Sequence, residues 1–225
     1  MNLGLSFFLI WSLFFSSPIP SSYPISEIKS NSEILIEILE SKYSELPSPS
    51  ALEMALTGYE KLDAKIKNEV LTVIDFSLPS TEKRMWIIDP ENGDILLHTL
   101  VAHGRNSGEL MAEKFSNTPE SYQSSIGFYL TAETYHGKHG YSLRLDGLEK
   151  GYNDMARARA IVIHGADYAT EAFAKSVGRL GRSLGCPALP SDLSKEAIDL
   201  IKDGSLLFIY GQDKNYLEKS SLIKA

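Results

Sequence analysis

The sequence predicts a mainly β domain of the sandwich or barrel-like kind, with short helices and two longer helices before it. Three observations support this prediction. Residues 70–213 contain short runs rich in β-branched and aromatic side chains, separated by glycine, proline or asparagine residues. Residues 26–66 carry apolar side chains at helical spacing. A hydrophobic fraction of 43% in 225 residues is enough for an ordinary globular core.

The first 22 residues are predicted to be a signal peptide. Residues 3–15 are mainly apolar, and this run is shorter than the about 20 residues that a membrane span needs. Small and proline-rich residues follow, as in a secretory leader, although no basic residue precedes Lys29 and no A-x-A site is present. We therefore expect export to the periplasm or cell envelope and no stable membrane span. A short uncleaved anchor or a buried helix is the alternative.

Residues 23–69 form a predicted helical segment to which no chemistry is assigned. The first helix is expected over 26–46 and ends before a proline-rich break. Ser50 and Glu53 have the spacing of a capping box, which predicts that the second helix begins there. The apolar face of this second helix is expected to comprise Leu52, Ala55, Leu56, Tyr59, Leu62 and Ile66.

The β-rich domain is predicted to span residues 70–213. Strands are expected at 70–77, 85–89, 95–103, 126–135, 141–145, 160–164 and 205–211. Asn92-Gly93 lies between the second and third of these runs and predicts a tight hairpin. Helices are expected around 169–176 and 195–202, and residues 214–225 are expected to be a polar tail.

Charge excludes one class of partner. The net charge is −7, and a general nucleic-acid-binding protein needs a basic surface that displaces counterions. We therefore expect no nucleic acid as a partner. A monomer is the default expectation for the oligomeric state.

The single cysteine, Cys186, is the strongest candidate for chemistry. An exported protein usually pairs its cysteines in disulfides, so one unpaired thiol in a Gly/Ser/Arg-rich setting favours a reactive group. Such a thiol needs a base, which His164 at the end of a predicted strand could supply. The Gly165 carbonyl could hold the other ring nitrogen, and the Gly185 and Cys186 amides could face an oxyanion.

The pattern His164-Gly165, followed by Ser183-x-Gly185-Cys186, resembles the signature of the YkuD-type L,D-transpeptidases of bacterial cell walls. The runs TYHGKHGYSLRLDGLEKGYNDMARARAIVIHGADY and GRLGRSLGCPALP are similar to the murein L,D-transpeptidase catalytic-domain branch. The resemblance extends over about residues 70–212.

The resemblance implies an acyl transfer on peptidoglycan stem tetrapeptides. Cys186 is implied as the nucleophile and His164 as the general base, with Gly165 orienting the imidazole and Gly185 contributing to the oxyanion site. D-Ala is released, and the amine of a second stem takes the acyl group. No metal or organic cofactor is implied.

The chain departs from the broader family at two positions. Leu184 stands where most members have a second histidine, and Ala188 stands where Asn or Arg is common. Arg182 and Arg179 are close in sequence and are candidates to replace the missing polar groups.

Further polar residues are candidates for substrate binding. Tyr135 and His139 belong to a glycine-rich loop that either borders the substrate groove or is a solvated hairpin loop. Arg144 is expected to pair with a substrate carboxylate or with Asp146. The remaining substrate-binding candidates are Ser183 and Arg182 beside the cysteine.

Other polar groups were assigned simpler roles or alternatives. A zinc site built from His136, His139, His164 and Cys186 is a less favoured alternative. The segment from His103 to Ser107 is expected to line the cleft. The pair Arg157 and Arg159 is expected on a solvated face, and His98 is expected to be structural.

Two other functions remain open at the level of sequence. An L,D-carboxypeptidase uses the same acyl-enzyme but resolves it with water. A catalytically silent wall-binding module keeps the fold without the reaction, and the presence of both Cys186 and His164 counts against it.

Overall fold

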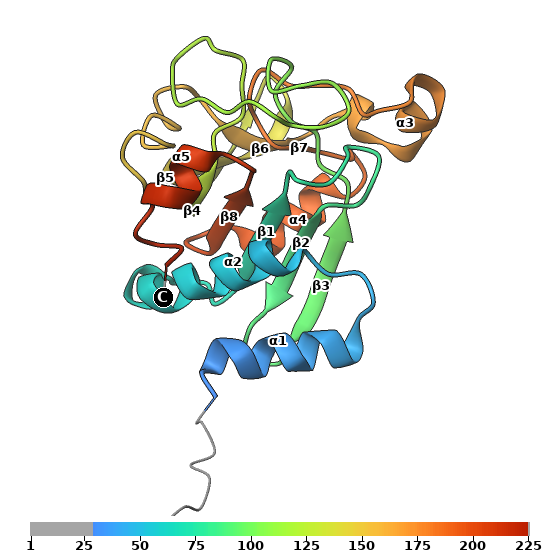
Figure 1. The fold of residues 1–225 in the computed structure, drawn as a ribbon. Coiled ribbons are helices and arrows are strands. Elements are labelled where there is room, and N and C mark those ends of the chain that lie inside the picture. The colour runs from blue at the N-terminus through green and yellow to red at the C-terminus, as the bar shows by residue number, and fades with distance from the viewer. Residues whose placement is uncertain (1–28, 225) are drawn as a thin grey trace, which may run out of the picture.

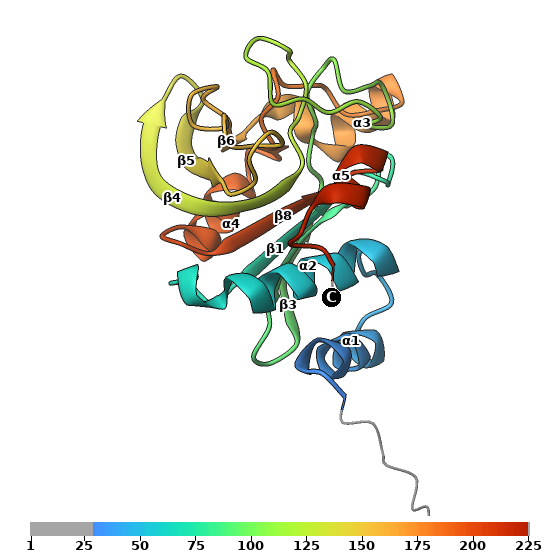
Figure 2. The same cartoon turned by 60° about the vertical axis from the view of Figure 1, so that its left-hand side comes forward.

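The computed structural model describes residues 29–224, so the predicted signal peptide lies outside the described residues. Eight strands form one sheet in the order β3-β2-β1-β8-β4-β5-β6-β7. Their bounds are β1 Leu71–Asp75, β2 Met85–Asp89, β3 Asp94–Thr99, β4 Gly127–Gly137, β5 Gly140–Gly147, β6 Val162–Gly165, β7 Ala188–Leu189 and β8 Leu206–Tyr210. The sheet curves strongly at β4 and β5 (Figure 2), and the prediction of a mainly β, barrel-like fold is confirmed.

The first half of the sheet follows the predicted hairpin. β2 and β3 pair antiparallel, and Gly93 in their turn has a φ of 62°, a conformation that glycine adopts without strain. β1 pairs antiparallel with β2 and parallel with β8. The two ends of the predicted β domain are therefore neighbours at the centre of the sheet.

The predicted third strand is shorter than expected. β3 ends at Thr99, and the following residues leave the sheet edge. Ala102 and Gly104 instead form isolated bridges to Ala188 and Ser183. The apolar pattern of the segment is satisfied because Val101 and Ala102 are buried beneath this second set of contacts.

The second half of the sheet positions the candidate site. β4 and β5 form a long antiparallel hairpin whose strands run to Gly137 and Gly140. β6 pairs antiparallel with β5, and β7 pairs parallel with β6. The ends of β6 and β7 therefore lie side by side beneath the tip of the β4–β5 hairpin.

Five α-helices lie within residues 29–224: α1 Asn31–Lys42, α2 Pro49–Leu62, α3 Glu171–Val177, α4 Ser194–Ile201 and α5 Lys214–Lys219. Figure 1 shows α2 in front of β1 and β8, with α4 behind the sheet. No helix in this part of the chain is long and apolar enough to cross a membrane.

The predicted capping box was placed on the wrong helix. α2 begins at Pro49 with Ser48 as its N-cap, and Ser50 lies inside the first turn. Proline suits the first helical position because it has no N–H to satisfy and its φ is already helical. A complete capping box occurs instead at α1, where Ser30 and Glu33 each accept from the other's backbone N–H.

Residues 214–224 are more than a polar tail. They contain α5, and both Tyr216 and Ile223 are buried in the main core. The Tyr216 hydroxyl and the Ser220 hydroxyl donate to the carboxyl group of Glu149, which also accepts from the Phe128 amide. The C-terminal segment is thereby attached to β4.

Candidate active site

His164 is held at the end of β6 in one tautomer. Its side chain is 2% exposed, and its Nδ1 lies 2.9 Å from the Gly165 carbonyl oxygen. Because a carbonyl only accepts, Nδ1 carries the proton and Nε2 has the free lone pair. Burial lowers the pKa of His164 below its ordinary value. The imidazole is therefore held neutral and able to accept a proton at Nε2.

His139 covers this imidazole. The two rings stack with centroids 4.3 Å apart and an angle of 24° between their planes. His139 comes from the two-residue turn between β4 and β5, so the predicted glycine-rich loop is the closed end of a hairpin. A positive charge on His139 opposes protonation of His164, which lowers the pKa of His164 further.

The segment that carries Cys186 is anchored on both sides. Before the cysteine, the Ser183 amide donates to the His103 carbonyl and the Arg105 amide donates to the Ser183 carbonyl. After it, Ala188 exchanges hydrogen bonds with Ala102 and pairs with His164 in the parallel β6–β7 ladder. This register places Cys186 two residues before the partner of His164.

The hydroxyl of Ser183 closes the turn from within. It is buried, accepts from the Gly185 amide at 3.0 Å and donates to the Cys186 carbonyl at 2.6 Å. Ser183 therefore shapes the nucleophile turn, whereas the sequence predicted a contact with substrate. The Gly185 amide is already hydrogen-bonded in this structure, which differs from the expectation that it faces an oxyanion.

Gly185 is required by its backbone and by its neighbours. Its φ is 123°, and a Cβ placed there lies 2.8 Å from the Gln123 carbonyl oxygen. The nucleophile turn is thus packed directly against the segment 116–125, which no sequence motif had linked to it.

The Cys186 thiol is only partly accessible. Its sulfur lies 3.6 Å from the Ala160 carbonyl, an acceptor for the S–H group. Burial raises the pKa of the Cys186 thiol, whereas the Val162 amide and the Arg159 guanidinium favour the thiolate. The resting sulfur is therefore a protonated thiol that needs a base and a positive field for reaction.

Arg159 lies beside this turn, and its expected place on a solvated face is wrong. Its guanidinium is half-buried and donates to four acceptors in residues 116–125, which are the carbonyls of Ser116 and Gln123 and the hydroxyls of Ser121 and Ser125. Arg157 is exposed and pairs with Glu133 and Asp146. The two arginines differ because the turn before β6 points them in different directions.

Three of the predicted substrate-binding residues lie elsewhere. Arg182 donates to Glu109, and Arg179 pairs with the same carboxylate. Arg144 lies 3.1 Å from Glu133, so the suggested partner Asp146 is wrong. The Arg144 guanidinium also lies over the ring of Tyr135, 4.3 Å from its centroid. These pairs connect neighbouring elements, and among the described contacts none reaches Cys186.

The segment after β3 has a buried base instead of a cleft-lining histidine. His103 is 1% exposed, and its Nδ1 accepts from Arg84 at 2.8 Å. Burial and the neighbouring arginine lower the pKa of His103 to about 4. His98 stacks on Trp86 with centroids 4.6 Å apart, a packing role.

The alternative zinc site is not assembled. Within residues 29–224, no group of three or more His, Cys, Asp or Glu side chains is arranged to hold a metal. His136 packs against Tyr141, whereas His139 packs on His164.

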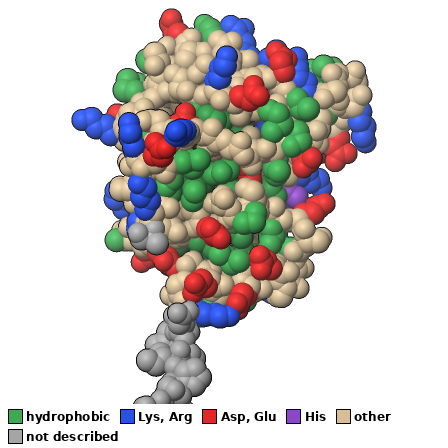
Figure 3. Space-filling view, viewed as in Figure 1, with side chains coloured by type: hydrophobic (Ala, Val, Ile, Leu, Met, Phe, Trp, Pro, Cys, Tyr) green, Lys and Arg blue, Asp and Glu red, His purple; other side chains and the backbone are tan. Residues whose placement is uncertain are grey.

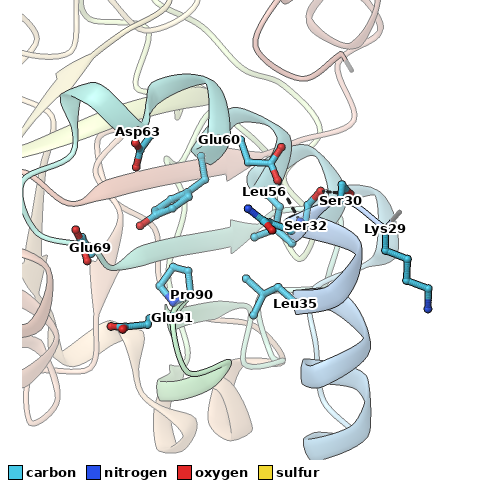
Figure 4. Close-up of a pocket in the computed structure, with 12 residues that line it drawn as sticks. Lys29, Ser30, Ser32, Leu35, Leu56, Glu60, Asp63, Glu69, Pro90 and Glu91 are labelled. Carbon is cyan, nitrogen blue, oxygen red and sulfur yellow. Dashed lines mark hydrogen bonds between the residues drawn. The ribbon is translucent and has the colours of Figure 1, made fainter. Parts of the chain in front are cut away.

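A separate hollow of about 880 Å³ lies between α1, α2 and the β2–β3 turn. Figure 4 shows that Glu60, Glu69 and Glu91 surround it, with Leu35 and Leu56 on its floor. Acidic side chains also gather at this end of the surface in Figure 3. None of the predicted site residues lines this hollow, so it is distinct from the Cys186 region.

Comparison with known families identifies the domain. A family model described as the L,D-transpeptidase catalytic domain matches residues 44–210. A search of curated protein sequences finds no match.

Solved structures with similar folds include three with low sequence identity. An L,D-transpeptidase from Mycobacterium smegmatis is 15% identical, with a TM-score of 0.38 over 64% of this chain and 59% of that one. The helical cell shape determining protein Pgp2 from Campylobacter jejuni is 14% identical, with a TM-score of 0.42 over 75% and 58%. An L,D-transpeptidase from Stackebrandtia nassauensis is 14% identical, with a TM-score of 0.39 over 74% and 69%. The chain thus spans less than two thirds of the length of the first two.

Proposed function

Because the chain belongs to the L,D-transpeptidase catalytic domain family, we propose that it is an exported cysteine acyltransferase acting on peptidoglycan stem tetrapeptides. One observation carries the proposal. The only cysteine lies on an anchored turn next to the strand that ends in His164, whose Nδ1–H is fixed on the Gly165 carbonyl. This arrangement supplies a nucleophile and a neutral base.

The reaction begins with a proton transfer. Nε2 of His164 takes the proton of the Cys186 thiol as the sulfur attacks the carbonyl carbon that precedes the terminal D-Ala. The C–N bond then breaks, and His164 returns the proton to the amine of the departing D-Ala. The product of this half-reaction is a thioester on Cys186.

The second half-reaction regenerates the thiol. A side-chain amine of another stem attacks the thioester, His164 removes the amine proton, and the sulfur leaves with a proton from His164. The Cys186 amide stabilises the oxyanion in both steps. Leu184 is 58% exposed beside the nucleophile, so the acceptor and donor stems meet an apolar side chain there.

Export and the partner follow from the same proposal. The substrate is peptidoglycan, which lies outside the cytoplasmic membrane, and the apolar segment 3–15 provides the leader. Cell fractionation and N-terminal mass analysis of the mature chain test this part. A full-length chain recovered in the cytoplasm contradicts it.

The deciding experiment mixes the full chain with a purified disaccharide-tetrapeptide and follows protein and product masses. Wild type is compared with Cys186→Ala. We expect an acyl adduct on the wild type alone, release of D-Ala and a cross-linked dimer. The same adduct yielding only tripeptide identifies an L,D-carboxypeptidase, and binding without any adduct identifies a silent wall-binding module.

A further inference from the structure

Arg159 is a cation without a counterion. Its four recorded hydrogen bonds go to two carbonyl and two hydroxyl oxygens, all of which are neutral. Among residues 29–224, no Asp or Glu oxygen lies within ion-pair distance of its guanidinium. A half-buried charge is normally paired because desolvation is costly, so this arrangement needs an explanation.

The guanidinium faces the nucleophile turn. A Cβ on Gly185 lies 3.4 Å from Nη2 of Arg159, and the next residue in the chain is Cys186. The backbone connects the same two places from the other side. Ala160, directly after Arg159, has a left-handed φ of 53° and turns its carbonyl to the Cys186 sulfur.

We propose that Arg159 is the counter-charge of Cys186, stabilising the thiolate and holding segment 116–125 against the nucleophile turn. The inference rests on the proposed function only in that it concerns the same cysteine. In the resting protein the thiol is neutral and neutral oxygens solvate the guanidinium. When the sulfur loses its proton, the only new anion in the site forms beside this unpaired cation. Arg159 acts through Cys186 and is a positioning residue.

The hydrogen bonds of Arg159 exclude a simpler role. Its two terminal nitrogens are each engaged twice, so they have no free N–H with which to bind a substrate carboxylate in the bidentate manner. They also hold a segment in which Glu120 and Tyr122 have left-handed φ values of 58° and 55°. Four fixed bonds keep both the charge and this strained segment in place.

The burial of Cys186 explains why the charge is needed. Removal of the sulfur from water raises the pKa of the thiol, and hydrogen bonding of S–H to Ala160 favours the same neutral form. Arg159 and the Val162 amide work in the opposite direction. An opposite charge close to a partly buried group shifts its pKa by about one unit or more.

The test measures the pKa of the single thiol, by the pH dependence of its alkylation with iodoacetamide in the full chain, read by intact mass. For Arg159→Gln we expect a rise of about one unit, and hence a roughly tenfold slower alkylation near neutral pH. For Arg159→Lys we expect a value close to wild type because the charge is kept. Arg157→Gln, in the same turn but paired on the surface, is the matched control and leaves the pKa unchanged.

A second pair of variants keeps the arginine. Ser125→Asp places a carboxylate against Nη1 of Arg159, whereas Ser125→Asn is its neutral counterpart. We expect the thiol pKa to be higher in the aspartate variant than in the asparagine variant. This comparison decides the question if Arg159→Gln does not fold.

The proposal is overturned if the thiol pKa is unchanged in folded Arg159→Gln, if Arg159→Lys shifts it as far as the glutamine does, or if the two Ser125 variants agree. The assay uses no peptidoglycan. Failure of the wild type to form an acyl adduct with stem peptides therefore counts against the proposed function and leaves this result intact.

Discussion

At the residue scale, local sequence identified the reacting groups but not their electrostatic environment. Cys186, His164 and Gly165 were found because strand-end and glycine signals mark them within a few positions. Arg159 was assigned to the surface because alternating arginines look alike in sequence. Its burial depends on segment 116–125, more than 30 residues away, and no local pattern reports such a contact.

The base sets the acidic limit of the proposed reaction. Burial lowers the pKa of His164 below its ordinary value of 6.5, so the imidazole stays neutral to lower pH than a free histidine. We expect acyl-enzyme formation to fall with an acidic midpoint below 6.5. The pH profile of adduct formation checks this, and His139→Ala, which removes the stacked ring, should move the midpoint upward. A midpoint at or above 6.5 in the wild type contradicts the assignment.

His103 makes stability depend on pH. Its folded-state pKa is about 4, and the unfolded chain titrates near 6.5. Between these values the unfolded state binds a proton that the folded state does not, so stability falls as pH is lowered from 6.5 to 4, by up to roughly 3 kcal/mol. Urea unfolding at several pH values measures the slope. His103→Asn keeps an acceptor for Arg84 and should flatten the slope, and an unchanged slope contradicts the prediction.

At the element scale, the types of most elements were predictable and their ends were not. The hairpin at Gly93 and the runs that became β1, β2 and β8 were found from composition and turn residues. The start of α2 was misplaced because Ser50 and Glu53 match a capping box in sequence, whereas Pro49 moves the helix start one residue earlier. β7 was missed because two residues carry no periodic signal.

The nucleophile turn depends on a glycine that a matched glycine can isolate. Gly185 and Gly178 both have positive φ, of 123° and 81°, but only Gly185 is crowded by a neighbouring carbonyl. We expect Gly178→Ala to cost about 1 kcal/mol of unfolding free energy and Gly185→Ala about 2 kcal/mol or more, together with slower alkylation of Cys186. Denaturant unfolding and thiol alkylation measure both. Equal losses in the two variants contradict the steric argument.

At the scale of the whole molecule, the sequence predicted the mainly β class but not the order of strands. The parallel pairing of β1 with β8 joins residues about 135 positions apart, and only the packed core specifies it. The pairing of residues 102–104 with the cysteine segment is equally remote. The site is therefore assembled by long-range packing, although its chemistry is written in short motifs.

The C-terminal segment belongs to this packing, which gives a prediction for the whole fold. Removal of residues 214–225 takes Tyr216 and Ile223 from the core and leaves the buried carboxyl group of Glu149 without two hydroxyl donors. We expect a loss of about 4 kcal/mol or more of unfolding free energy, because two apolar side chains and two hydrogen bonds are removed together. Tyr216→Phe keeps the ring and should lose only about 1–2 kcal/mol. Lys214→Ala, an exposed position in the same helix, should stay within about 0.5 kcal/mol of wild type. Denaturant unfolding of the three variants orders them, and a truncated chain as stable as the full chain shows that the segment is a tail after all.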